Sequence, residues 1–184
     1  MRPTNQQWTI DASHSNIEFA VRHLMISTVR GRFTEVTGAI ELDPDDPSEG
    51  RGEITIPVAS IDTGEANRDQ HLRSPDFFDA ETHPTMIYRT RRVEPLRGGK
   101  LRVVGDLTIR GVTKEVPLTV ERGGAARDPW GNFRVAYAAS ATLNRRDFGL
   151  TWNKALETGG VLVGDEIKIS VEVQLVRQAE QAAA

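Results

Sequence analysis

Apolar and polar residues alternate along most of this chain with a period of two. Between residues 16 and 24, Ile17, Phe19 and Val21 share one face, while Glu18 and Arg22 lie on the other. The alternation recurs in seven further runs, at residues 36–42, 53–58, 85–90, 101–109, 112–120, 133–143 and 167–176. This pattern is typical of antiparallel strands with one buried and one solvated face. The segment "WTID" at residues 8–11 leaves room for a short additional strand.

Eight strands that each carry a single apolar face need closure or a second sheet to bury that face. We therefore expect an all-β protein built as an eight-stranded antiparallel barrel, since closure also removes exposed strand edges. A two-sheet sandwich is the alternative, and Pro57 and Pro117, which interrupt strand patterns, would suit its edges or bulges. Turn-forming stretches such as "DPDDPSEG", "RGGK" and "RGGAARDPWGN" separate the runs, and Arg110-Gly111 predicts a tight hairpin.

Two segments depart from the alternation. Residues 65–74 predict a short helix, with Asp62 and Asn67 as candidate caps and Pro75 as its end. Residues 148–160, "FGLTWNKALETGG", predict either a short helix or an ordered loop. Because no repeat or linker divides the 184 residues, we expect a single domain over residues 1–184, with mobile chain ends.

Composition removes several classes of function. The net charge of −3 and the isoelectric point near 5.8 argue against a nucleic-acid partner, which normally requires a basic face. The absence of cysteine excludes disulfides and thiolate chemistry. No apolar run resembles a signal peptide or approaches the roughly 20 residues of a transmembrane helix. We therefore expect a cytoplasmic protein without a transmembrane segment, or a periplasmic or secreted one if a leader was removed.

The motifs of common catalytic sites are absent from the sequence. There is no glycine-rich phosphate loop, nucleophile elbow or HExxH motif. The four histidines lack the spacing of a metal site, so we predict no metal and no cofactor; they are His14, His23, His71 and His83. Arg68, Asp69 and His71 could form an acid–base set. The plainer interpretation, which we favour, is a hydrogen-bonded cluster that fixes the helix to the rim of the barrel.

Small residues interrupt the inward-facing row of the predicted barrel. They are Gly38, Gly105, Ala139 and Ala141. The interior of an eight-stranded barrel is either just filled by side chains or just able to hold one small ligand. Small inward residues favour a cavity, whereas large neighbours such as Phe33 and Tyr137 could fill the same space, so both readings stay open.

Several longer stretches match a known family. They include "WTIDASHSNIEFAVRHL", "NRDQHLRSPDFF" and "GDLTIRGVTKEV", and the match covers about residues 8–177. In these stretches the chain resembles the YceI-like family of lipocalin-like polyisoprenoid-binding proteins. The resemblance implies an extended eight-stranded barrel, a short helix near its opening and an elongated apolar cavity. It further implies binding of a long isoprenoid or similar amphiphilic lipid, of the polyprenyl phosphate or quinone type.

The resemblance and the inward-facing positions together give candidate binding residues. The cavity is expected to be lined by Phe19, Val21, Ile40, Met86, Tyr88, Val103, Leu107, Phe133, Tyr137, Ala139, Ala141 and Ile169. The rim is expected to consist of His23, Arg68, His71, Arg73, Phe77 and Phe78. In this reading the two arginines and His71 supply cationic donors for a polar or phosphorylated head group, since guanidinium matches phosphate oxygens.

The leading functional hypothesis is a non-catalytic protein that carries, stores or sequesters a hydrophobic small molecule. One alternative is an enzyme that acts on a lipid-like substrate through the His/Arg/Asp rim. Another is a stress-response module whose cavity fills opportunistically. The sequence leaves the oligomeric state open, a homodimer included.

Overall fold

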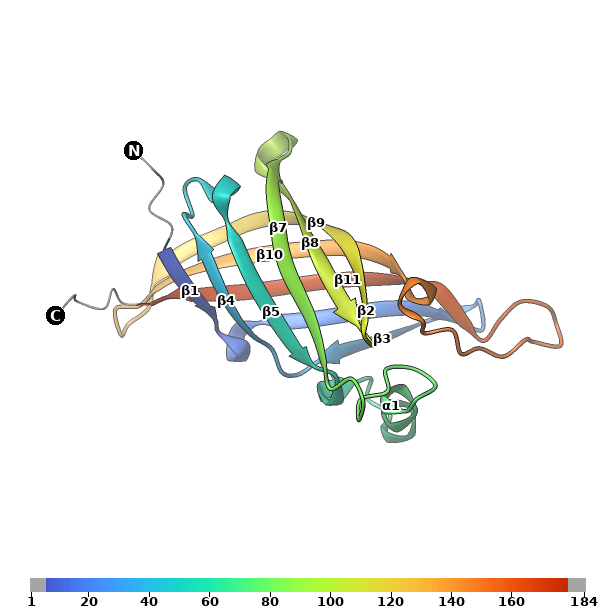
Figure 1. Cartoon of the computed structure of the whole chain (residues 1–184). Helices are drawn as coiled ribbons and strands as arrows, with labels where there is room; N and C mark the ends of the chain where they lie inside the picture. The colour runs from blue at the N-terminus through green and yellow to red at the C-terminus, as the bar shows by residue number, and fades with distance from the viewer. Residues whose placement is uncertain (1–5, 179–184) are drawn as a thin grey trace.

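The computed structural model describes residues 6–178, so the chain ends for which mobility was expected lie largely outside that range. Long antiparallel strands close around a common interior, with one short helix at one end (Figure 1). The strands are β1 (Gln6–Ile10), β2 (Asn16–His23), β3 (Ser27–Phe33), β4 (Thr37–Leu42), β5 (Arg51–Pro57), β6 (Ile61–Asp62), β7 (Thr85–Pro95), β8 (Leu101–Ile109), β9 (Val112–Arg127), β10 (Phe133–Asn144) and β11 (Val163–Arg177). The helix α1 spans Ala66–Arg73, and the 3-10 turns are η1 (Ala12–His14), η2 (Pro47–Glu49), η3 (Val58–Ser60), η4 (Arg97–Gly99) and η5 (Arg145–Phe148).

These eleven segments form the predicted eight-stranded barrel. Three barrel strands are interrupted by a bend, and each of them therefore consists of two segments: β1 with β2, β3 with β4, and β5 with β6. The turn η1 separates β1 from β2, yet both pair with β11. In the same way β4 pairs with β1 while β3 pairs with β2, and β6 continues β5 alongside β3. The barrel closes where Trp8 and Ile10 of β1 pair with Arg177 and Leu175 of β11. The sandwich alternative is therefore wrong.

The barrel wall separates along one seam, between β9 and β10. The two strands pair from Arg127 and Phe133 as far as Thr119 and Ser140, and the first half of β9 has β8 alone as its paired neighbour. Pro117 lies in that half, which has no second paired neighbour, as suits a residue without a backbone N–H. The turn η5 and the loop of residues 149–162 follow β10 near this seam.

Several local predictions needed correction. The strand β3 was not predicted, because its inward positions include Gly31 and its outward ones include Arg30 and Arg32, which weakens the alternation. The predicted turn at residues 122–132 is strand as far as Arg127, where β9 and β10 pair around a bulge. Residues 149–162 are an ordered loop with one isolated bridge, and no α-helix forms there.

The predicted helix exists, and its N-cap is Glu65, which was not one of the two predicted caps. The carboxylate of Glu65 accepts hydrogen bonds from the backbone N–H groups of Asn67 and Arg68, at 3.1 and 2.6 Å. Neither Asp62 nor Asn67 caps the helix. It ends at Arg73, and its C-cap Ser74 directly precedes Pro75. No helix among residues 6–178 is long and apolar enough to cross a membrane.

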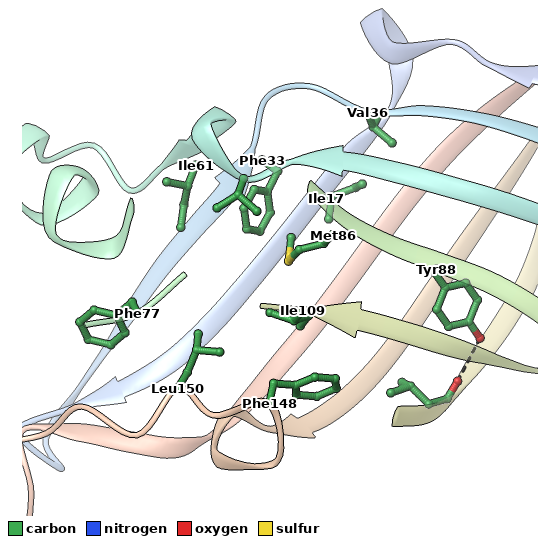
Figure 2. Packing of buried hydrophobic residues seen from close by; sticks show 12 residues of the cluster. Ile17, Phe33, Val36, Ile61, Phe77, Met86, Tyr88, Ile109, Phe148 and Leu150 are labelled. Atoms are coloured by element: carbon green, nitrogen blue, oxygen red, sulfur yellow. Dashed lines mark hydrogen bonds between the residues drawn. The ribbon is translucent and has the colours of Figure 1, made fainter. Parts of the chain in front are cut away.

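The interior holds two apolar clusters, one toward each end of the barrel. The cluster nearest α1 includes Phe33, Phe77 and Phe148, which are labelled in Figure 2. The other surrounds Trp8 and Leu175, which are 0% and 1% exposed. Residues of both clusters line one elongated cavity.

Candidate functional site

An elongated cavity of about 310 Å³ runs through the barrel. Its wall begins at Leu72, Phe77 and Phe78 near α1 and continues to Pro47 and Gly50 at the far end. Along β11, alternate residues from Ile167 to Leu175 face it, as a strand with one inward side requires. The lining from residue 163 to residue 175 covers twelve steps of strand, or roughly 40 Å at about 3.3 Å per residue. The space is therefore long and narrow.

Eleven of the twelve predicted cavity residues belong to this lining. They are Phe19, Val21, Ile40, Met86, Tyr88, Val103, Leu107, Tyr137, Ala139, Ala141 and Ile169. Their contact with a ligand stays a prediction. The twelfth, Phe133, lies beyond the end of the cavity: its ring packs 6.0 Å from that of Trp8 and 5.4 Å from the guanidinium carbon of Arg177.

The small inward residues contribute to the cavity unequally. Ala139 and Ala141 line it. Gly105 leaves no space, because the Tyr88 ring covers it so closely that a Cβ there would approach Tyr88 Cζ to 2.5 Å. Gly38 is likewise covered by Ile10. These two glycines accommodate neighbouring side chains, so they were poor evidence for a cavity.

Part of the lining was absent from the predicted set of cavity residues. Phe33, expected only as a bulky residue that could fill the interior, comes from the unpredicted strand β3, and Phe148 and Leu150 come from irregular segments after β10. No periodicity could have found the last two. Phe33 meets Phe78 edge to face at 6.0 Å, and Phe77 packs 5.3 Å from Trp152, so aromatic rings surround the α1 end of the cavity.

The rim arginines make bonds to the protein itself. Arg68 donates from Nε to the Thr63 hydroxyl at 2.7 Å and from Nη2 to the Thr63 carbonyl at 2.9 Å. Arg73 donates to the carbonyls of Ala59 and Ile61, at 3.0 and 2.9 Å. Neither arginine is among the residues that line the cavity. Both attach α1 to the segment around β6, in agreement with the plainer interpretation of the cluster.

The candidate acid–base set is not assembled. Asp69 is buried and accepts hydrogen bonds from the backbone N–H and hydroxyl of Thr63, at 3.0 and 2.5 Å. His71 instead pairs with Asp76, with 2.8 Å between Nε2 and Oδ2, and lies edge-on against Phe77. His71 is outside the cavity lining, and so is His23, which pairs with Val163 at the end of β2.

One residue of the cavity lining, Arg145, is a buried cation whose guanidinium is fully hydrogen-bonded. Arg145 is 5% exposed, and burial lowers the pKa of its guanidinium. It donates to four backbone carbonyls, those of Leu150, Trp152, Val163 and Gly164. The carboxylate of Asp165 lies 3.3 Å away. Because these partners use its donors, Arg145 organises the loop that follows β10 and offers no free charge to a ligand.

The two tyrosines of the lining differ in their bonding. The Tyr88 hydroxyl lies 3.1 and 3.0 Å from the carbonyls of Val103 and Val116, and burial raises the pKa of that hydroxyl. The Tyr137 hydroxyl is buried and, within residues 6–178, has no hydrogen-bond partner. The same range contains no group of three or more His, Cys, Asp or Glu side chains that could hold a metal ion. The wall of the cavity is thus almost entirely apolar.

A family model described as a YceI-like domain matches residues 8–175. The chain belongs to the YceI-like family. Among its curated relatives, the UPF0312 protein SA2479 of Staphylococcus aureus is 37% identical over 168 residues, which cover 91% of this chain and 95% of the relative.

Solved structures of similar proteins share this YceI-like barrel. Burkholderia cenocepacia BcnA has a TM-score of 0.74 and 26% identity, with 90% of this chain and 98% of that chain covered. The Campylobacter jejuni YCEI protein has a TM-score of 0.72 and 32% identity, with 86% and 90% covered. A polyisoprenoid binding domain from Saccharophagus degradans has a TM-score of 0.68 over 93% and 98% of the two chains. At 14% identity, that last likeness establishes the fold alone.

Proposed function

We propose that this protein binds one long apolar chain, of the isoprenoid or quinone-tail type, inside the barrel and acts as a carrier, store or sequestering protein. The observation that carries the proposal is the cavity itself, which is narrow, about 310 Å³ in volume and lined almost wholly by apolar side chains. A polyisoprenoid binding domain of the same fold, from Saccharophagus degradans, supports this class of ligand.

The size of the cavity sets the scale of the binding energy. One water-sized group needs about 10–15 Å³ of such volume, so the cavity has room for roughly 20 to 30 of them. Burial of one methylene group is worth about 0.8 kcal/mol. A chain that fills even half of the positions would gain roughly 8 kcal/mol or more before the costs of association. The apolar tail therefore decides whether a ligand binds.

The head group contributes less in this proposal than the sequence alone suggested. Arg68 and Arg73 already donate hydrogen bonds to backbone carbonyls, and Arg145 donates to four. None of these three guanidinium groups is therefore free to bind a phosphate head group. A charged hydrogen bond would add only about 1.5–3 kcal/mol in any case. We therefore expect alcohol, quinone and phosphate heads on the same tail to bind with similar affinity.

A displacement assay tests the proposal. A fluorescent lipid probe is bound first, and prenols of increasing length then compete with it, followed by prenyl phosphates and quinones on matched tails. Affinity should rise steeply with tail length until the cavity is full and should vary within about tenfold among head groups. Affinity that is insensitive to tail length, or a strict requirement for one head group, would contradict this function.

A further inference from the structure

The end of the barrel where β2 meets β3 presents apolar side chains to solvent. The loop between these strands holds Leu24, Met25 and Ile26, which are 36%, 60% and 78% exposed. Beside it lies the loop of residues 154–161, in which Val161 is 39% exposed. The Leu24 N–H donates to the Leu162 carbonyl at 2.8 Å, so the two loops form one projection, which we call the apolar tip. Figure 1 shows both loops side by side at the end opposite the chain termini.

The backbone of the apolar tip is unusual for the residues that it carries. Leu24 and Met25 have φ angles of 53° and 61°. Positive φ is uncommon outside glycine, and the polar residues Asn and Asp are the usual exceptions. Leu24 and Met25 therefore adopt a strained backbone conformation and also expose apolar side chains to water, where Asn, Asp or Gly would avoid both costs. Strain of this kind combined with exposed apolar side chains points to a functional surface.

The tip is continuous with one end of the cavity. Val21 and Val163 line the cavity. Val21 lies three residues before Leu24 of the tip, and Val163 lies two residues after Val161 of the tip. At its base His23 of β2 pairs with Val163 of β11. A lipid that left the cavity at this end would therefore pass directly along exposed apolar side chains.

The area and charge of the tip favour a lipid surface as its partner. Four exposed side chains at the end of a projection are few beside the 20 to 30 residues per side of a stable protein interface, so a second copy of the chain is a poor fit. The charged residues at positions 22–26 and 154–161 are Arg22, Lys154 and Glu157. Lys154 and Glu157 of the tip balance each other, and Arg22 of β2 at its base adds one positive charge, so nothing in the tip repels a lipid surface with anionic head groups.

We propose that the apolar tip docks on a lipid bilayer, where Leu24, Met25, Ile26 and Val161 enter the interfacial layer and the cavity exchanges its ligand. This inference rests on the proposed function, because it assigns the place at which the lipid is collected or delivered. The tip touches the bilayer while the opposite end, with the β9–β10 hairpin and the exposed Trp130, stays in water.

The sequence allows a clean test, because it contains no cysteine. Ile26→Cys carries an environment-sensitive fluorophore at the tip, and Trp130→Cys carries the same fluorophore at the opposite end. The two positions are similarly exposed, at 78% and 83%. Phosphatidylcholine vesicles, with and without phosphatidylglycerol, should shift the emission of the label at residue 26 to the blue and leave that at residue 130 unchanged. A shift at residue 130 alone, or at neither position, would overturn the inference.

Substitutions separate this inference from the proposed function. Ile26→Asp should lower the vesicle-bound fraction at least tenfold, about 1.4 kcal/mol, while Trp130→Asp leaves it unchanged. Both variants should bind a fluorescent lipid probe in vesicle-free solution as the unaltered protein does. Normal probe binding without any vesicle association would refute the docking surface and leave the ligand proposal standing. A change of oligomeric state in Ile26→Asp, measured without vesicles, would identify a second copy as the partner and also refute it.

Discussion

Filling the cavity with a single bulky side chain should abolish lipid binding without unfolding the barrel. Ala139 lies on β10 and lines the cavity near its middle, where Ala139→Trp places an indole. The indole occupies roughly nine methylene-sized positions, and at about 0.8 kcal/mol for each the ligand loses up to ~7 kcal/mol of binding energy. That loss corresponds to a fall in affinity of about 10⁵-fold for a ligand that fills the cavity. Overpacking of a filled core costs only about 1–3 kcal/mol, and an open cavity should cost less.

The neighbouring residue offers a matched control. Ala138 is exposed, because adjacent residues of a strand point to opposite faces. Ala138→Trp therefore adds the same indole outside the barrel and should leave binding unchanged. The assay is titration with a fluorescent lipid, together with urea unfolding of both variants. If Ala139→Trp binds the lipid as well as Ala138→Trp does, the ligand does not occupy the cavity and this reasoning fails.

Two further predictions concern stability. Arg145→Met should destabilise the protein by about 3 kcal/mol, because it leaves several buried carbonyls without a donor. Arg146→Met, at the exposed neighbouring position, should cost under about 0.5 kcal/mol. Equal urea midpoints for the two variants would disprove the role of Arg145. Bonds from the Asn132 side chain and from Arg134 hold the pKa of Asp128 at about 2, below its unfolded value of 3.8. Its stabilising contribution is therefore present above about pH 4 and lost as the pH falls toward 2. Asp128→Asn should flatten that part of the curve of melting temperature against pH, and an unchanged slope would show that Asp128 is not responsible.

The alternation of residues was enough to predict most of the barrel, because a period of two reports directly which face of a strand is buried. It failed at β3, where Gly31 takes an inward position that the Phe19 ring of the neighbouring strand covers. It failed again at Gly123 and Gly124, which look like a turn and lie inside β9. Gly31 and Gly123 each accommodate a neighbour, the Phe19 ring and Ala136, that only the folded structure supplies.

The polar residues of the rim show a second limit of sequence reasoning. Arg68 and Arg73 have the chemistry to bind a phosphate. The sequence does not show whether their guanidinium groups meet a ligand or a backbone carbonyl in the folded protein. The structure places carbonyls there. Arg145, which the prediction omitted, is surrounded by carbonyls from segments up to 19 residues away, so no local pattern could have identified it.

Mass spectrometry of an organic extract from protein purified without detergent tests whether the barrel holds a lipid. We expect one long-chain lipid class, near one molecule per barrel, that is present with the unaltered protein and with Ala138→Trp and absent with Ala139→Trp. An extract without lipid, or one whose contents change with the expression host and share no chemistry, would contradict the claim that this barrel is a dedicated lipid-binding protein.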